Sequence, residues 1–286
     1  MKPKRFKYIY LLLCVALCIT TISRGYYLKH HTNEGNPFSR AINTIIPEAI
    51  PGINHVIDDS LSDLEETKKM ERTIERFMAQ WEIKGASLAI MKNGKLLYSK
   101  GFGIADSAKG TPVNVSNIFR IASLSKLSTA TGIMKLWEEK KLSLDQPVFG
   151  EKGILNDSAF LNIKDPRIRE ITVEHLLRHQ GGYSIRAGDP LFCTPSVAQS
   201  MQTPLPLSAD DMVRFASSTR LRFRPGEGNA YSNLGYVVLG KVIEKVSGMP
   251  YETFIRDSIL IPIGCFDMHI GYSEPDKHFP NEVHYY

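Results

Sequence analysis

The chain has 286 residues, of which 43% are hydrophobic and 23% charged, and its formal net charge is +5. This composition is typical of a globular protein with a sizeable core, and it excludes a wholly disordered chain, a collagen-like chain and a small disulfide scaffold. Much of the positive excess lies at the very start of the chain, in Lys2, Lys4, Arg5 and Lys7. The basic charge is therefore a terminal feature and does not indicate a nucleic-acid-binding surface.

An apolar run extends from Tyr8 to Ile22, directly after the basic cluster. A basic segment followed by an apolar run is typical of a secretory signal, whereas the flanking charges disfavour a buried helix of a soluble domain. The run is shorter than the roughly 20 residues of a membrane-spanning helix. We expect residues 1–29 to be a signal peptide or an N-terminal anchor in the inner membrane, with cleavage left open, and residues 30–62 to be a tether. The domain that follows, residues 63–286, is expected to be exported and to face the periplasm.

Cys14 and Cys18 fall in the apolar run, and Cys193 and Cys265 lie in the domain after it. Two cysteines in that domain are too few for a disulfide framework. We expect two free thiols there, although an oxidising compartment leaves open whether they pair.

The pattern after the tether predicts a helix over residues 63–80, followed by a β-hairpin. The hairpin consists of apolar-rich runs at 86–91 and 95–104 around Asn93-Gly94, a strong signal for a two-residue turn. A lone hairpin needs a packing partner, and the sequence predicts no second pair of strands. The rest of the chain is predicted to be mainly helical, with helices over residues 123–140, 173–178, 209–217, 234–247 and 251–259.

The segment Ser123-Leu124-Ser125-Lys126 is an S-x-x-K motif at the start of a predicted helix. Residues three apart share a helix face, so the Ser123 hydroxyl and the Lys126 amine can meet. A serine hydroxyl becomes a good nucleophile when a base takes its proton, and a lysine can do so if burial or nearby positive charge favours its neutral form. Taken alone, the motif favours a capping serine and a surface lysine. The apolar face through which this helix is expected to pack consists of Leu127, Ala130, Met134 and Trp137.

A second motif, Tyr231-Ser232-Asn233, lies where the helix over residues 234–247 is predicted to start. The Tyr231 phenol can relay a proton between a nucleophile and a leaving group, and Asn233 can hold both Lys126 and a substrate carbonyl. Taken alone, this motif favours a turn tyrosine followed by a helix N-cap.

Four segments together outweigh those simpler interpretations. These segments closely resemble landmarks of the serine β-lactamase and penicillin-binding-protein superfamily, and they occur in the same order. The branch that they resemble contains class C β-lactamases, D,D-carboxypeptidases and esterases. The four segments are Ile118–Lys126, Lys141–Val148, Ile171–His179 and Phe223–Tyr236. The resemblance covers about residues 63–284. It implies an α+β fold, with an antiparallel sheet flanked by helices, an all-helical region and an active site between the two.

The resemblance also implies a role for each motif residue. Ser123 would be the acylated nucleophile, Lys126 its activating base and Tyr231 the proton relay. Asn233 would bind substrate, and the Ser123 N–H would be one oxyanion donor. No metal and no organic cofactor would be needed.

The sequence departs from the family pattern in three places. His179-Gln180-Gly181-Gly182 stands where H-T-S-G is usual, and residues 153–169 resemble an insertion that could remodel the rim of the cleft. The family's third motif, K-T-G or H-x-G on a downstream strand, would supply a cation, a hydroxyl and the second oxyanion N–H. His269-Ile270-Gly271 has the letters of H-x-G but comes too early, so we interpret the match as fortuitous. We therefore expect an incomplete sheet and a C-terminally truncated family member, or a fragment of a longer gene product.

Two functional hypotheses follow. The first is a serine hydrolase that forms an acyl-enzyme on a β-lactam, a D-Ala-D-Ala-type peptide or an ester. The second is a catalytically inactive, membrane-tethered remnant that binds peptidoglycan or a protein partner.

The expected partners are a small-molecule or peptidoglycan-peptide substrate and the membrane, with no nucleic acid, and the expected state is a monomer. Zinc is disfavoured because His175 and His179 lack the glutamate of a zinc protease, and the sequence contains no G-x-S-x-G, Walker A or G-x-G-x-x-G motif.

Overall fold

The structure is a computed structural model that describes residues 65–93, 95–183, 185 and 188–286. The predicted signal or anchor and the predicted tether lie outside the described residues, so export and anchoring stay predictions. Within the described part, no helix is long and apolar enough to cross a membrane.

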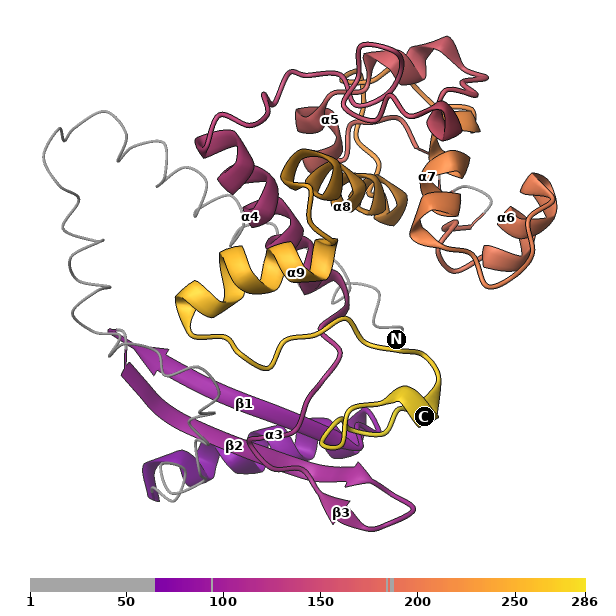
Figure 1. Cartoon of the computed structure of the whole chain (residues 1–286). Coiled ribbons are helices and arrows are strands. Elements are labelled where there is room, and N and C mark those ends of the chain that lie inside the picture. Colours follow the sequence, from indigo (N-terminus) through magenta and orange to yellow (C-terminus); the bar gives the residue numbers. More distant parts are fainter. Residues whose placement is uncertain (1–64, 94, 184, 186–187) are drawn as a thin grey trace, which may run out of the picture. The chain divides into compact units, whose positions relative to one another are not determined.

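The described chain begins, after a short 3-10 turn, with one helix and three strands: α3 (Lys68–Gln80), β1 (Gly85–Lys92), β2 (Lys95–Asp106) and β3 (Thr111–Pro112). Strands β1 and β2 form the predicted antiparallel hairpin, and Asn93 adopts a left-handed conformation in its turn. Strand β3 pairs with β2, so the sheet has the order β1–β2–β3 (Figure 1). The α+β class expected from the sequence is confirmed.

Helix α3 packs on one face of the hairpin. Met78 of α3 forms a small core with Tyr98 and Phe102 of β2. Glu71 is buried in the same interface, where its carboxylate accepts hydrogen bonds from the Tyr98 hydroxyl (3.1 Å) and the Lys100 ammonium (3.1 Å). A buried carboxylate is costly unless it is paired in this way, so the contact fixes how α3 lies on the strands.

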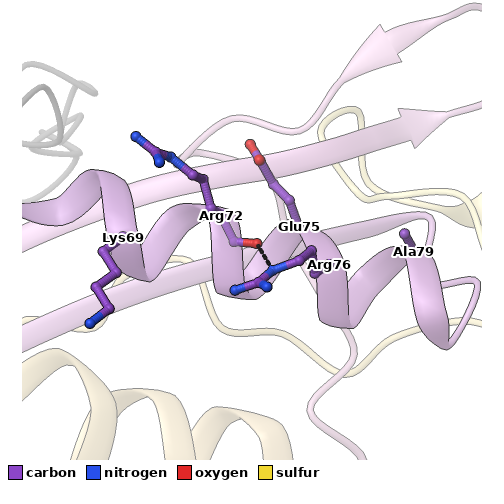
Figure 2. A pocket seen from close by; sticks show the side chains of 5 residues that line it. All are labelled: Lys69, Arg72, Glu75, Arg76 and Ala79. Carbon is purple, nitrogen blue, oxygen red and sulfur yellow. Dashed lines mark hydrogen bonds between the residues drawn. The ribbon is translucent and has the colours of Figure 1, made fainter.

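The outer surface of α3 has a shallow hollow of about 610 Å³, which Figure 2 shows. Within it, Arg76 Nε donates a hydrogen bond to the backbone oxygen of Arg72 at 3.2 Å. The lining residues all belong to this helix: Lys69, Arg72, Glu75, Arg76 and Ala79. None of the residues of the two sequence motifs lines the hollow, and we assign it no function.

Helices form most of the remaining chain: α4 (Ser125–Glu138), α5 (Val173–Leu177), α6 (Thr194–Met201), α7 (Ala209–Ser218), α8 (Asn233–Ser247) and α9 (Tyr251–Ile255). Helix α9 continues as a π-helical turn over Arg256–Leu260. Helix α8 packs against α4, α5, α7 and α9. The predicted helices agree with these bounds to within a few residues, and α6 is an addition that the sequence did not predict.

Helix α8 has clear start and stop signals. The Ser232 side chain caps its N-terminus by accepting the Gly235 N–H at 2.9 Å. Gly248 ends the helix at φ 72°, a conformation that glycine adopts readily. The residues that it buries recur at helical spacing: Leu234, Val238, Leu239, Val242 and Ile243.

Helices α4, α8 and α9 approach closely at Gly132. A Cβ atom at Gly132 would lie 2.9 Å from Ile255 Cδ1 and 3.0 Å from Ile243 Cδ1. One turn earlier, Thr129 Oγ1 and the Tyr251 hydroxyl share a hydrogen bond of 2.7 Å. These contacts fix α4 against α8, and the two motifs lie at the starts of these two helices.

One packing prediction is only partly right: Trp137 of α4 packs against the main core as expected, but Leu127 and Met134 do not. Leu127 is 68% exposed and Met134 is 38% exposed. The residues that α4 does bury are Thr129, Gly132, Ile133 and Leu136. The small residues among them allow the close approach to α8 and α9. The segment 153–169 is also more than a rim insertion, since Leu155 and Ile168 lie in the main core.

The last residues of the chain hold the segment that precedes Ser123. Ile118 forms a parallel bridge with Glu282. The Arg120 side chain donates from Nε to the Glu282 carboxylate at 3.2 Å, and the Arg120 backbone N–H donates to the Tyr285 hydroxyl at 2.8 Å. The approach of the chain to Ser123 is therefore fixed by residues that lie far away in the sequence.

Candidate active site

The structure brings together all four residues that the two motifs singled out. Lys126 Nζ donates a hydrogen bond to Ser123 Oγ at 3.3 Å, and the Tyr231 hydroxyl donates to the same oxygen at 2.7 Å. Lys126 Nζ also donates to Asn233 Oδ1 at 2.6 Å. The serine oxygen thus has two neighbours that can exchange protons with it, which is the arrangement that an activated nucleophile requires.

Ser123 lies in a 3-10 turn, Ala122–Leu124, just before α4, and not in the helix itself as predicted. Ala122 has a φ of 44°, in the left-handed region that is costly for a residue with a side chain. Backbone strain of this kind concentrates at functional sites. The Ser123 N–H has no hydrogen-bond acceptor in the part of the chain that the structure describes, so it is available to an oxyanion.

Tyr231 and Asn233 flank Ser232, the N-cap of α8. Their positions therefore follow from the packing of α8 against α4. Ser123 is exposed and Tyr231 is 43% exposed, whereas Lys126 is half-buried between α4 and α8. The nucleophile faces solvent, while the lysine beside it is partly shielded.

His179 also belongs to this group, although the sequence gave it no role. Its ring lies 4.5 Å from the Tyr231 ring and 5.1 Å from the Tyr236 ring, and its Nδ1 accepts the Ser232 N–H at 3.2 Å. Burial, and then the positive charge of Lys126, lower the pKa of His179 from 6.5 to about 4. The His179 ring is therefore neutral at physiological pH, and it packs against the Tyr231 ring.

Asp189 is a second residue that sequence reasoning missed. Its carboxylate Oδ2 accepts a hydrogen bond from Asn233 Nδ2 at 2.8 Å. Lys126, on the other side of Asn233, also faces two aromatic rings, with Nζ 4.8 Å from the centre of Tyr231 and 5.7 Å from that of Tyr236. The lysine is thus surrounded by an amide oxygen, a hydroxyl and two ring faces, all of which attract a cation.

His269, the residue with the letters of the third motif, lies elsewhere. Its ring stacks on Phe279 at 4.6 Å, and its Nδ1 is 3.9 Å from a carboxylate oxygen of Glu252. His175, the other histidine considered for zinc, accepts the Thr172 N–H at its Nδ1 in the capping box of α5. Among the residues that the structure describes, no three His, Cys, Asp or Glu side chains form a group that could hold a metal ion.

Comparison with known proteins identifies a family that this sequence matches. The sequence matches the Beta-lactamase family over residues 70–286. It is 25% identical over 217 residues to Esterase EstB of Burkholderia gladioli, a match that covers 73% of this chain and 53% of the relative. It is 32% identical over 201 residues to Penicillin-binding protein 4* of Bacillus subtilis (strain 168), with 69% of this chain and 40% of the relative covered.

A solved structure gives the same result. The octameric penicillin-binding protein homologue from Pyrococcus abyssi is 34% identical, with a TM-score of 0.60 over 75% of this chain and 46% of that chain. The chain therefore spans about half the length of these relatives or less. The superfamily resemblance drawn from the four sequence segments is confirmed.

Proposed function

The chain belongs to the beta-lactamase family, and on that basis we propose that it is a serine hydrolase that forms an acyl-enzyme through Ser123. The observation that carries the proposal is the contact of Ser123 Oγ with both Lys126 Nζ and the Tyr231 hydroxyl. In this arrangement Ser123 is the nucleophile, Lys126 its base and Tyr231 the proton relay. Asn233 binds substrate and positions Lys126.

The proposed reaction starts with attack of Ser123 Oγ on the acyl carbon of the substrate, while the hydroxyl proton passes to neutral Lys126. The Ser123 N–H stabilises the resulting oxyanion. When the bond to the leaving group breaks, Tyr231 gives that group a proton, and the Lys126 ammonium returns one proton to the Tyr231 phenolate. Water then attacks the ester, and the acid product and free Ser123 are released.

The proposed substrates are a β-lactam, a D-Ala-D-Ala-type peptide or an ester. All three present an acyl carbon with a leaving group to the same nucleophile. The names of two relatives, an esterase and a penicillin-binding protein, support the ester and the β-lactam. Initial rates on nitrocefin, a p-nitrophenyl ester and a D-Ala-D-Ala peptide, measured side by side, identify the preferred class.

A second candidate function is binding without turnover, as in a membrane-tethered remnant that holds peptidoglycan or a protein partner. The observation that favours it is the position of His269, which stacks on Phe279 and not beside Ser123. In the described part of the chain, His269 therefore does not supply a third-motif cation beside Ser123.

Covalent labelling tests the first proposal, because it needs an activated serine but not a full catalytic cycle. The chain is treated with a fluorophosphonate probe, and the modified peptide is mapped by mass spectrometry. The adduct is expected on Ser123, to be lost in Ser123→Ala and to persist in Ser125→Ala, a matched control two residues along the chain. An adduct on another residue, or no adduct on the folded chain, contradicts the assignment.

A further inference from the structure

The side-chain amide of Asn233 lies between a donor and an acceptor. Its Oδ1 accepts from Lys126 Nζ at 2.6 Å, and its Nδ2 donates to Asp189 Oδ2 at 2.8 Å. An ammonium group can only donate hydrogen bonds and a carboxylate can only accept them. The amide therefore has one orientation that satisfies both neighbours, because a flip would set NH₂ against Lys126 and oxygen against Asp189.

Asp189 is itself held in place. Its Oδ1 accepts the Leu191 N–H at 2.9 Å, which leaves Oδ2 for Asn233. Its backbone oxygen accepts the N–H groups of Phe192 (2.9 Å) and Cys193 (3.0 Å). No salt bridge involves Asp189 in the described part of the chain. The carboxylate is thus a fixed acceptor that is directed at the Asn233 amide.

The Asp189 carboxylate decides the orientation of the Asn233 amide when Lys126 is neutral. Once Lys126 has lost a proton, its nitrogen carries a lone pair that can accept a hydrogen bond from an amide NH₂ group. Lys126 alone then no longer prevents Asn233 from flipping. While Asp189 holds the NH₂ group, however, Asn233 presents only oxygen to Lys126. The amine must donate to that oxygen, and its lone pair is left for the proton of Ser123, whose Oγ is 3.3 Å away.

We propose that Asp189 is a positioning residue for acylation, which orients the Asn233 amide so that the lone pair of neutral Lys126 faces Ser123. This inference rests on the proposed function and extends it to a residue outside both motifs. Asp189 touches neither the nucleophile nor the substrate in this scheme, and it acts through Asn233.

The test uses Asp189→Asn, which keeps an oxygen for the Leu191 N–H but lets the Asn233 amide adopt either orientation. The rate of fluorophosphonate labelling at Ser123 is expected to fall about tenfold or more, because misplacement of a catalytic group is costly. The thermal unfolding midpoint is expected to stay close to that of the wild type. In an Asn233→Ala background the same substitution is expected to have no further effect.

Three results would overturn the proposal. The first is wild-type labelling by Asp189→Asn. The second is an equal loss in the Asn233→Ala background, which would mean that Asp189 acts through its loop. The third comes from NMR of the chain labelled with ¹⁵N-asparagine, where the Asn233 Nδ2 signal is assigned by its loss in Asn233→Ala. This signal is expected to shift and to lose its protection from exchange in Asp189→Ala, and an unchanged signal counts against the proposal.

The NMR measurement also separates the two proposals. If the wild-type chain is not labelled at Ser123, the proposed function fails, and the Asn233 signal still shows whether Asp189 holds the amide. If the wild type is labelled and Asp189→Asn is labelled equally fast, the inference about Asp189 fails alone.

Discussion

The contacts of Lys126 bear directly on which group takes the Ser123 proton. The lysine nitrogen donates to Ser123 and Asn233 and lies over two aromatic rings, and these contacts suit an ammonium group. The base role requires the neutral amine. The Tyr231 hydroxyl is also nearer to Ser123 Oγ, at 2.7 Å against 3.3 Å for Lys126 Nζ. Substitution of each residue therefore separates base from relay.

Lys126→Met is expected to abolish labelling of Ser123 without unfolding the chain, because the group that takes the proton is lost. Tyr231→Phe is expected to label at a nearly normal rate, since fluoride needs little help to leave, and to lower turnover of esters or amides by about 10²-fold or more. Lys135→Met, also on α4, is the control and should behave as the wild type. Normal labelling by Lys126→Met together with none by Tyr231→Phe would make Tyr231 the base.

His179 is expected to stay neutral down to about pH 4, because burial and the charge of Lys126 lower its pKa from 6.5. The unfolded chain binds this proton more tightly, so the contribution to the free energy of unfolding is full above pH 6.5 and is lost as the pH falls toward 4. An NMR titration of the histidine rings measures this pKa. Lys126→Met should raise it part of the way, and titration near 6.5 in the wild type would contradict the burial of the ring.

Four residues of the candidate site, Ser123, Lys126, Tyr231 and Asn233, could be predicted from the sequence because each belongs to a short motif at the start of a helix. Asp189 could not, because it meets Asn233 only after a distant loop has folded against α8. His179 lay inside a recognised segment, but its spacing from His175 gave no sign that its ring would pack on Tyr231. Roles that arise from loop geometry leave little trace in local sequence.

At the level of helices, the site depends on how closely α4 approaches α8. Gly132→Val is expected to destabilise the fold by about 1–3 kcal/mol, because even its Cβ would lie within about 3.0 Å of two isoleucine methyl groups. It is also expected to slow labelling of Ser123, since displacement of α4 separates Lys126 from Asn233. The matched control is Gly240→Val on α8, where the nearest contact of a Cβ is 3.5 Å. Urea unfolding measures stability, and equal effects of the two variants would refute this account.

Elements with strong local signals were predicted well. The Asn93-Gly94 turn located the hairpin, and the ends of α8 were predicted to within one residue. Helix α6 was missed because it buries little more than Val197 and Ala198, which leaves a weak apolar pattern in the sequence. The buried face of α4 was predicted only in part, because the side that packs depends on the neighbouring helices, which approach too closely at Gly132 for a larger side chain.

For the whole molecule, we propose that residues 1–29 direct export and that the chain after them lies in the periplasm. The basic residues before Tyr8 are expected to stay cytoplasmic. An alkaline phosphatase fused at Tyr286 should then be active in cells, and a fluorescent protein that folds only in the cytoplasm should be dark. Exchange of the four basic residues for glutamine should weaken this orientation. Fluorescence at the fusion in the wild type would contradict export.

The exposed apolar surface predicts how the isolated domain behaves. Met91 and Leu97 on the hairpin are 66% and 46% exposed, and Leu124 and Leu127 beside the site are 65% and 68% exposed. Strand β1 also has one edge without a partner among the described strands. Exposed apolar faces and open strand edges favour association. These features predict association of the isolated domain, whereas the sequence predicted a monomer.

Residues 63–286 are therefore expected to associate as their concentration rises and to bind the dye ANS, as measured by light scattering after size exclusion and by fluorescence. The double variant Met91→Lys/Leu97→Lys should associate less, because it replaces two exposed apolar side chains of the hairpin with charges that oppose contact between copies. The control Ala108→Lys/Ser273→Lys adds the same charge at exposed loop positions and should change the association little. It therefore separates the effect of the exposed hairpin residues from the effect of net charge. A chain that stays monomeric at all concentrations and binds no dye would mean that these side chains are covered in solution.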